Sequence, residues 1–267
     1  MSEAIGQPGG AALPRPMGVG DILGTAFELY RRHWQTLLAI AAVVVVPLTL
    51  LQYLLGHWVR TQGEATSNGV VSTSSWAVAI AGLVTGLAGL LMYLVLTGAI
   101  TRAVAAEVAG EDPTVEQSYR FGFYRLGSVL LVSVLVGLAT LGGLILLVIP
   151  GIYVGVRLAV STQALVVEGR RGTEAMGRSW SLVGGHWWHA FATLLVAALL
   201  TGIVNAVITT PFSGTSWVVQ ALAAAVATVV TLPYGVLVGV LLYLELRARK
   251  ENLSLEALRA NLRASAA

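Results

Sequence analysis

Arg157 is the residue whose type and surroundings most clearly suggest chemistry, because it is the one charge well inside a long apolar stretch. An arginine within a membrane-spanning segment lines a polar pathway, binds an anionic headgroup or pairs with a neighbouring group. Its long stem can also snorkel, so that only the charged head reaches the interface. Tyr153 lies one helical turn before it, on the same side. The sequence favours a structural or headgroup-binding role for Arg157 and leaves the polar pathway open.

Two His-Trp pairs, His33-Trp34 and His186-Trp187, are the next candidates, and His189 follows the second pair closely. Histidine often binds metal ions, but no histidine or carboxylate cluster in this chain has the spacing of a metal site. Tryptophan is enriched at membrane–water interfaces. We therefore expect these residues at the interface in a lipid-binding or structural role, with no metal and no cofactor.

The sequence shows no catalytic constellation. Glu168 and Glu174 are predicted to be isolated acids at a helix end, and no nucleophile elbow, P-loop, dinucleotide fingerprint or zincin motif is present. The absence of cysteine excludes disulfides, thiolate catalysis and cysteine-ligated metals. No signal of a nucleic-acid-binding fold supports binding to DNA or RNA. We expect a non-enzymatic protein that does not bind nucleic acid.

The composition identifies the elements that must position these residues. Hydrophobic residues make up 56% of the chain and charged residues only 11%, against roughly 25% charged in soluble domains. The apolar residues gather in blocks long enough to cross a bilayer, about 20 residues each. The sequence predicts an all-α, polytopic integral membrane protein with six transmembrane helices, arranged as three hairpins. The blocks are Gln35–Leu55, Trp76–Thr101, Ser128–Ile149, Ile152–Val167, Trp188–Thr210 and Trp217–Leu246.

Proline and glycine mark the turns, and basic residues mark the orientation. Pro150-Gly151 separates the third and fourth blocks and predicts a tight hairpin turn. All basic residues except Arg60 and Arg157 fall on one side of the six spans, and the side rich in Lys and Arg is generally cytoplasmic. Both termini are therefore expected in the cytoplasm. Arg157, about 8 Å along its helix from Ile152, is expected near the outer end of its span.

A repeat divides the chain. Gly24–Trp34 and Gly177–Trp187, shifted by 153 residues, share Gly, Leu, His and Trp. Each segment predicts an amphipathic helix at the cytoplasmic interface that leads into a transmembrane hairpin. The alternative is that both segments only reflect the general bias toward basic and aromatic residues at cytoplasmic helix ends. The segment Thr114–Leu126 is a weaker third copy.

The expected domain organisation follows this repeat. Residues 1–18 form a disordered cytoplasmic tail, and a six-helix membrane domain occupies 19–250. Its repeat units are about 19–109, 112–168 and 172–250. The C-terminal tail, 251–267, includes a possible short amphipathic helix at Ser254–Arg263. A small-xxx-small glycine pair in the second helix of each unit permits close helix packing: Gly82/Gly86, Gly151/Gly155 and Gly235/Gly239.

Several motifs resemble one family. Pro150-Gly151-Ile152-Tyr153, the later Arg178-Ser179-Trp180, and the opening Gly20-Asp21-Ile22-Leu23-Gly24 are similar to the membrane domain associated with glycerophosphoryl diester phosphodiesterases. Gln163 stands where many relatives are expected to have a proline. The resemblance runs from Val19 to about Leu246 and implies a stand-alone six-helix protein of the bacterial plasma membrane. The phosphodiesterase itself is a separate soluble barrel, so the resemblance carries no catalytic residue onto this chain.

These observations favour an accessory, lipid-interacting or transport-related membrane protein. Its expected partners are membrane lipids, and a membrane protein or a second copy of the chain. The alternative is a small secondary transporter with a polar pathway near Arg157. Such a transporter should bring polar residues from several helices together at mid-membrane.

Overall fold

Every described element of the chain is helical in the computed structural model. In chain order these are α1 (Val19–Arg32), α2 (Trp34–Glu64), α5 (Leu126–Leu146), α6 (Val148–Leu158), α7 (Ser161–Glu168), α8 (Thr173–Val183), α9 (Trp187–Thr209), the 3-10 turn η1 (Thr210–Phe212) and α10 (Trp217–Glu251). The structure describes residues 16–64, 80, 82–83, 86, 89, 96–102, 104, 126–170, 172–251, 254, 256–258 and 260–261. The all-α class is confirmed for these residues.

Four of the described helical segments are long and apolar enough to cross a membrane: Trp34–Trp58, Val148–Glu168, Trp187–Phe212 and Trp217–Glu251. They correspond to the first, fourth, fifth and sixth predicted blocks. The third block coincides with α5, in which a shorter apolar stretch, Leu130–Thr140, is described. Most of the second block lies outside the described residues. Helices of membrane-spanning length are therefore confirmed at four of the six expected places.

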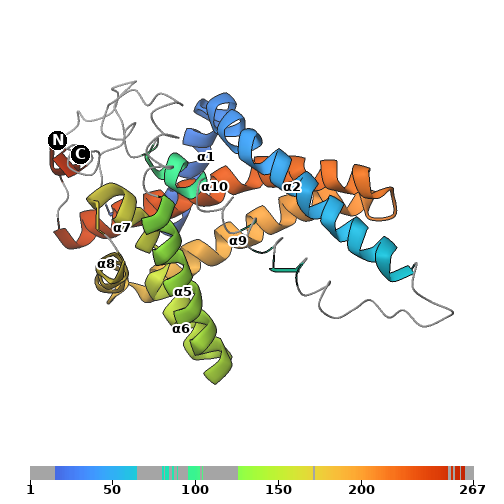
Figure 1. Cartoon of the computed structure of the whole chain (residues 1–267). Helices are drawn as coiled ribbons and strands as arrows, with labels where there is room; N and C mark the ends of the chain where they lie inside the picture. Colours follow the sequence, from blue (N-terminus) through green and yellow to red (C-terminus); the bar gives the residue numbers. More distant parts are fainter. Residues whose placement is uncertain are drawn as a thin grey trace.

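The last helix, α10, is the centre of the bundle. α9 runs alongside it and α2 crosses it, while the α5–α6 hairpin projects away from them (Figure 1). In the most apolar window of α10, 61% of the residues are buried, against 11% for α9. α1 lies across α10, where the Tyr30 hydroxyl donates to the Val230 carbonyl at 3.0 Å and Tyr234 donates to the Leu23 carbonyl at 3.3 Å. α10 thus carries the core, and α9 presents most of its surface outward.

The α5–α6 hairpin turns earlier than the sequence predicted. Leu147 alone links the two helices, with an extended backbone (φ −169°, ψ 150°). Pro150 falls in the first turn of α6, where its missing N–H needs no helical partner. Gly151 serves packing, since a Cβ on Gly143 of α5 would lie 2.9 Å from the Gly151 Cα. The predicted hairpin is present, but the prediction that its turn lies at Pro150-Gly151 was wrong.

The predicted fourth block is two helices, because the chain breaks at Ala159-Val160 between α6 and α7. Such a break frees backbone carbonyls that must find other donors inside a membrane. The Ser161 hydroxyl donates to the Leu158 carbonyl at 2.7 Å, and the Ser179 hydroxyl of α8 donates to the Arg157 carbonyl at 2.8 Å. Two serines therefore satisfy carbonyls at the break and bind α8 to it.

The histidines of the two His-Trp pairs have similar backbone geometry. His33 has φ −117° and ψ 23°, and His186 has φ −124° and ψ 26°. Each histidine directly precedes a long apolar helix, and its carbonyl accepts the first helical bond of that helix at 3.0 Å. His33 alone links α1 to α2, whereas Gly184, Gly185 and His186 link α8 to α9. These similarities favour the predicted duplication of the first and third units. The weaker copy at 114–126 lies outside the described residues, so the threefold repeat stays a prediction.

The glycine pairs differ in what surrounds them. A Cβ on Gly155 would lie 3.3 Å from Thr140 of α5, and a Cβ on Gly239 would lie 2.8 Å from the Gln163 amide nitrogen. No atom lies within 4 Å of a Cβ built on Gly235. Gly82 and Gly86 also have open space, but most residues around them in sequence are outside the described part of the chain.

Both ends of the membrane domain extend the core. Met17, assigned by sequence to the disordered tail, is 7% exposed, and its carbonyl accepts a hydrogen bond from Arg249 at 3.3 Å. Within the C-terminal tail, Ser254 caps a helical turn by accepting the Ala257 N–H at 3.1 Å, and Leu258 is fully buried. The ordered domain therefore begins before Val19 and includes part of the predicted C-terminal helix.

Candidate functional site

Arg157 joins α6 to the C-terminal end of α8. Its Nη1 donates to the Trp180 carbonyl at 2.8 Å, and its Nε donates to the Tyr153 hydroxyl at 3.1 Å. The guanidinium carbon lies 4.6 Å from the centre of the Trp180 ring and 5.4 Å from that of Tyr153, within the range of cation–π attraction. Helix carbonyls at a C-terminus carry partial negative charge, which suits a cation there. Arg157 therefore holds α6 and α8 together, and we call this set of contacts with Tyr153 and Trp180 the Arg157 bracket.

Trp187 completes an aromatic cluster on this bracket. Its indole N–H donates to the Tyr153 carbonyl at 3.2 Å, and its ring stacks on those of Tyr153 and Phe191, with centroids 5.7 and 5.0 Å away. Arg157 and Trp187 therefore lie at the same end of the bundle. The sequence placed Trp187 at the cytoplasmic interface and Arg157 near the outer end. These contacts show that the two placements cannot both hold, because Arg157 follows the Leu147 turn by ten residues, about 15 Å of helix.

Glu168 was predicted to be an isolated acid, and this was wrong. At the end of α7 its carboxylate accepts bonds from Arg170 at 2.7 Å, from Arg178 of α8 at 2.8 Å and from the Tyr243 hydroxyl of α10 at 2.7 Å. Its side chain is 7% exposed. Arg170 is two residues away and Arg178 ten, but Tyr243 is 75 residues away on another helix, so no local motif could have revealed the whole network.

Two residues of α10 extend this network. Arg178 also binds Glu251 with both terminal nitrogens, and Arg247 lies 3.2 Å from Glu251 and 3.5 Å from Glu168. Burial would lower the pKa of Arg178, but its bonds to Glu251 and Glu168 raise the pKa above its usual value. The guanidinium stays charged, and the network fastens α7, α8 and α10 together at one end.

A second charged pair, Glu245 with Arg249, lies on α10 where it faces α9. Glu245 is fully buried, and one carboxylate oxygen accepts from Arg249 at 2.6 Å. The other oxygen faces Nε2 of His189 at 3.5 Å. Nearby, burial and the positive charges of Arg249 and Lys250 hold the pKa of His186 below its usual value. The second His-Trp pair thus belongs to a charged, partly buried helix junction.

The first His-Trp pair is not brought to Arg157. Trp34 is 49% exposed at the start of α2, whereas Trp187 is packed in the aromatic cluster. The predicted lipid-binding or structural residues therefore divide into two places: Arg157, Trp187 and His186 near α8, and His33 and Trp34 at the α1–α2 junction. Among the described residues no group of three or more His, Cys, Asp or Glu could hold a metal ion.

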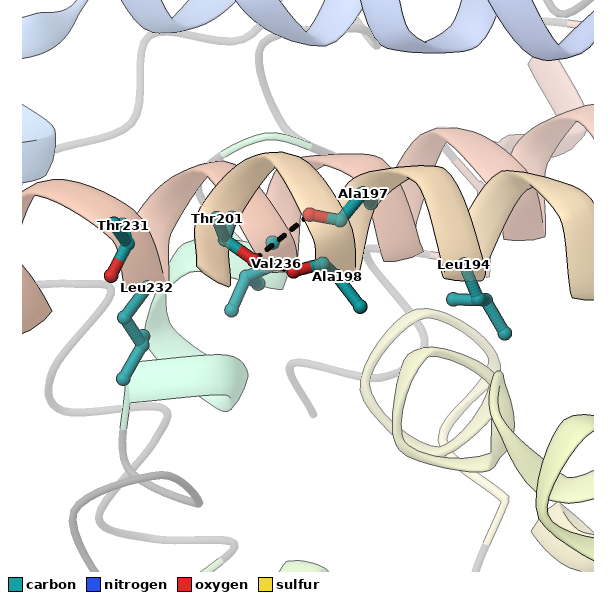
Figure 2. A pocket seen from close by; sticks show the side chains of 8 residues that line it. Leu194, Ala197, Ala198, Thr201, Thr231, Leu232 and Val236 are labelled. Atoms are coloured by element: carbon teal, nitrogen blue, oxygen red, sulfur yellow. Dashed lines mark hydrogen bonds between the residues drawn. The ribbon is translucent and has the colours of Figure 1, made fainter. Parts of the chain in front are cut away.

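An apolar groove of about 280 Å³ lies between α9 and α10. Figure 2 shows Leu194, Ala197, Ala198 and Thr201 on its α9 side and Thr231, Leu232 and Val236 on its α10 side. The two threonine hydroxyls donate to carbonyls of their own helices, at 2.8 Å for Thr201 and 2.7 Å for Thr231. Since these polar atoms are satisfied, the groove offers mainly van der Waals contact. Sequence reasoning missed it, apart from the glycine at 235.

No protein-family model, curated protein or solved structure matches the chain.

Proposed function

We propose that this chain is a six-span plasma-membrane protein with cytoplasmic termini, which binds membrane lipid and carries out no chemical reaction. The observation that carries the lipid-binding role is the α9–α10 groove. It is small, apolar and open along its side, and its lining holds no unsatisfied polar group that an aqueous solute would need. A phospholipid acyl chain has the chemistry that fits this surface. The resemblance to the membrane domain associated with glycerophosphoryl diester phosphodiesterases implies the six-span fold and the membrane location and carries no catalytic residue onto this chain.

The outward surface of α9 supports the same proposal. Around the groove, Leu199, Ile203 and Val207 are 56%, 61% and 68% exposed. Such a continuous apolar surface is stable against lipid chains and costly in water. An acyl chain seated in the groove would continue the lipid layer that covers α9.

The alternative transporter with a polar pathway near Arg157 finds less support. The Nε and Nη1 atoms of Arg157 donate hydrogen bonds to Tyr153 and Trp180. At the adjacent helix break, the hydroxyls of Ser161 and Ser179 donate to backbone carbonyls. In transporters, carbonyls at broken helices are instead available to coordinate the substrate or ion. The described part of the chain thus favours Arg157 as a structural bracket.

The test is photo-crosslinking with a phospholipid that carries a diazirine on its acyl chain. The chain, purified in nanodiscs, should label on α9 near Ala198 and on α10 near Gly235. Ala198→Leu and Gly235→Leu fill the groove from its two sides and should reduce that labelling severalfold. Ala206→Leu is the matched control, because Ala206 is also exposed on α9 but lies outside the groove. Equal labelling of the parent and both groove variants would contradict an acyl-chain site.

Topology needs a separate experiment. Reporter fusions after Gly63, Gly169 and Ala267 should show extracytoplasmic activity at Gly63 alone if six spans place both termini in the cytoplasm. An extracytoplasmic C-terminus would exclude the six-span arrangement whatever the groove binds.

A further inference from the structure

The end of α8 is covered by an arginine that another helix supplies. Arg157 of α6 lies over the Trp180 ring, and a Cβ built on Gly184 would be 2.7 Å from its Nη1. The glycine therefore leaves the space that the Arg157 guanidinium occupies. Trp187 lies beside the same site, bonded to the Tyr153 carbonyl. At this junction one guanidinium lies over the Tyr153 and Trp180 rings, and its Nε and Nη1 donate to protein groups.

The end of α1 has the same pattern of residue types with its own arginine. The 153-residue shift that pairs the two His-Trp junctions also pairs Phe27 with Trp180, Trp34 with Trp187, and Arg31 with Gly184. Ile22 and Ala26 of α1 are fully buried, as are their counterparts Ala175 and Ser179 of α8. The two helices therefore turn equivalent faces inward.

The outer face of α1 is open. Phe27, 60% exposed, lies one helical turn before Arg31 on α1, and Trp34, 49% exposed, begins α2 two residues after Arg32. Arg31 and its neighbour Arg32 are both exposed, and within the described part of the chain neither makes a hydrogen bond or an ion pair. Glu28 lies one turn before Arg32, yet the two form no described ion pair. The face is cationic and aromatic, with no counter-charge bound.

We propose that Phe27, Arg31, Arg32 and Trp34 form a headgroup site that binds an anionic phospholipid of the bilayer. The two guanidinium groups supply charge and donors for a phosphate, and Arg presents these donors in pairs. Exposed aromatic rings beside them are stable at the headgroup level of a membrane, which favours a bilayer lipid over a free phosphate ion. The lipid phosphate takes the place that the Trp180 carbonyl has for Arg157. This site rests on the proposed membrane location, but it is independent of the α9–α10 groove.

The experiment measures lipid selectivity. The full chain is reconstituted with phosphatidylcholine and a minor fraction of phosphatidylglycerol, extracted in mild detergent, and the two lipids that remain bound are quantified. Each basic residue near an anionic surface contributes about 1 kcal/mol, or roughly fivefold in affinity. Arg31→Gln with Arg32→Gln should therefore lower the enrichment of phosphatidylglycerol at least fivefold. Arg31→Lys with Arg32→Lys keeps the charge and should retain most of the enrichment.

Two further variants separate this site from a general effect of surface charge or of membrane contact. Arg170→Gln removes a basic residue that is also exposed but is paired with Glu168, and it should leave the enrichment unchanged. Phe27→Ala should lower the bound amount of both lipids without changing their ratio. The proposal is overturned if the double glutamine variant keeps the parent enrichment while circular dichroism shows an intact helical fold, or if Arg170→Gln loses as much. If the parent retains neither lipid, both this site and the proposed lipid-binding function fail. If only the groove fails to label, the acyl-chain site is lost and the headgroup site stands.

Discussion

Replacing Arg157 by leucine should lower the free energy of unfolding by about 2–3 kcal/mol. The change removes a charge-assisted bond of 2.8 Å to the Trp180 carbonyl, a type of bond that contributes about 1.5–3 kcal/mol. It also removes stacking on Trp180 and Tyr153, which adds about 0.5–1 kcal/mol at a partly exposed site. The Trp180 carbonyl keeps a second donor, the Gly184 N–H at 3.2 Å. Because this carbonyl is not left unsatisfied, the expected loss in the free energy of unfolding does not exceed about 3 kcal/mol.

Replacing Arg157 by lysine distinguishes a bracket from a snorkelling side chain. An ammonium group can reach the Trp180 carbonyl, but it has no planar face to stack on the ring and no fixed second donor for the Tyr153 hydroxyl. The bracket predicts a loss of about 1 kcal/mol for lysine, between the parent and leucine. Snorkelling alone predicts that lysine equals arginine, because both reach the interface.

The assay is reversible unfolding in mixed micelles, followed by tryptophan fluorescence. A double-mutant cycle of Arg157→Leu with Trp180→Leu isolates the stacking and should give a coupling of about 0.5–1 kcal/mol. The backbone bond survives in Trp180→Leu, so the cycle separates the two contributions. If Arg157→Leu unfolds within about 0.5 kcal/mol of the parent, as an ordinary surface substitution would, the bracket does not stabilise the fold.

Three other changes test the packing and the charged network. Gly143→Ala should destabilise the α5–α6 hairpin by about 1–3 kcal/mol, because its Cβ would meet backbone atoms of Gly151. Gly142→Ala is the control and should leave stability unchanged, because its Cβ would enter open space. The micelle unfolding assay compares the two variants directly. Glu168→Gln should cost about 3 kcal/mol in the same assay by leaving buried guanidinium groups short of a counter-charge, and a loss no larger than that of an exposed acid would contradict the network. Stability should fall as the pH drops through about 6.5, because the pKa of His186 is lower in the folded state than in the unfolded chain. His186→Asn should flatten that part of the curve of stability against pH. A curve for His186→Asn identical to that of the parent would refute this role of His186.

The sequence predicted the positions of the long helices more accurately than the turns and breaks between them. Long apolar blocks reveal membrane-spanning helices because span length and hydropathy are local properties of the chain. The turn at Leu147 was missed because Pro150 is equally compatible with a turn and with the first turn of a helix. The break at Ala159-Val160 has no proline or glycine at all, and the serines that stabilise it lie on two helices. Such tertiary stabilisation cannot be read from a local pattern.

The candidate site was predicted in part for the same reason. Arg157 stood out as a lone charge, but its partner is the backbone carbonyl of Trp180, which has no signature in sequence. Glu168 looked isolated because its partner Tyr243 is 75 residues away. The His-Trp repeat was visible, and it pointed to the α1–α2 and α8–α9 junctions, where His33 and His186 have similar backbone dihedral angles. What it could not show was that an arginine of α6 covers only the second of them.

The distribution of polar bonds supports the proposal that this chain binds lipid in preference to a polar solute. The ion pairs of Glu168 and Glu245, and the Arg157 bracket, all lie at the end of the bundle where α8 meets α10. Toward the α5–α6 turn the described contacts are apolar or between small residues, and Ile149 is 81% exposed. Apolar helix faces can part and admit acyl chains without breaking a hydrogen bond. A polar solute would need donors and acceptors there, and the charged groups that could supply them already bind one another at the other end.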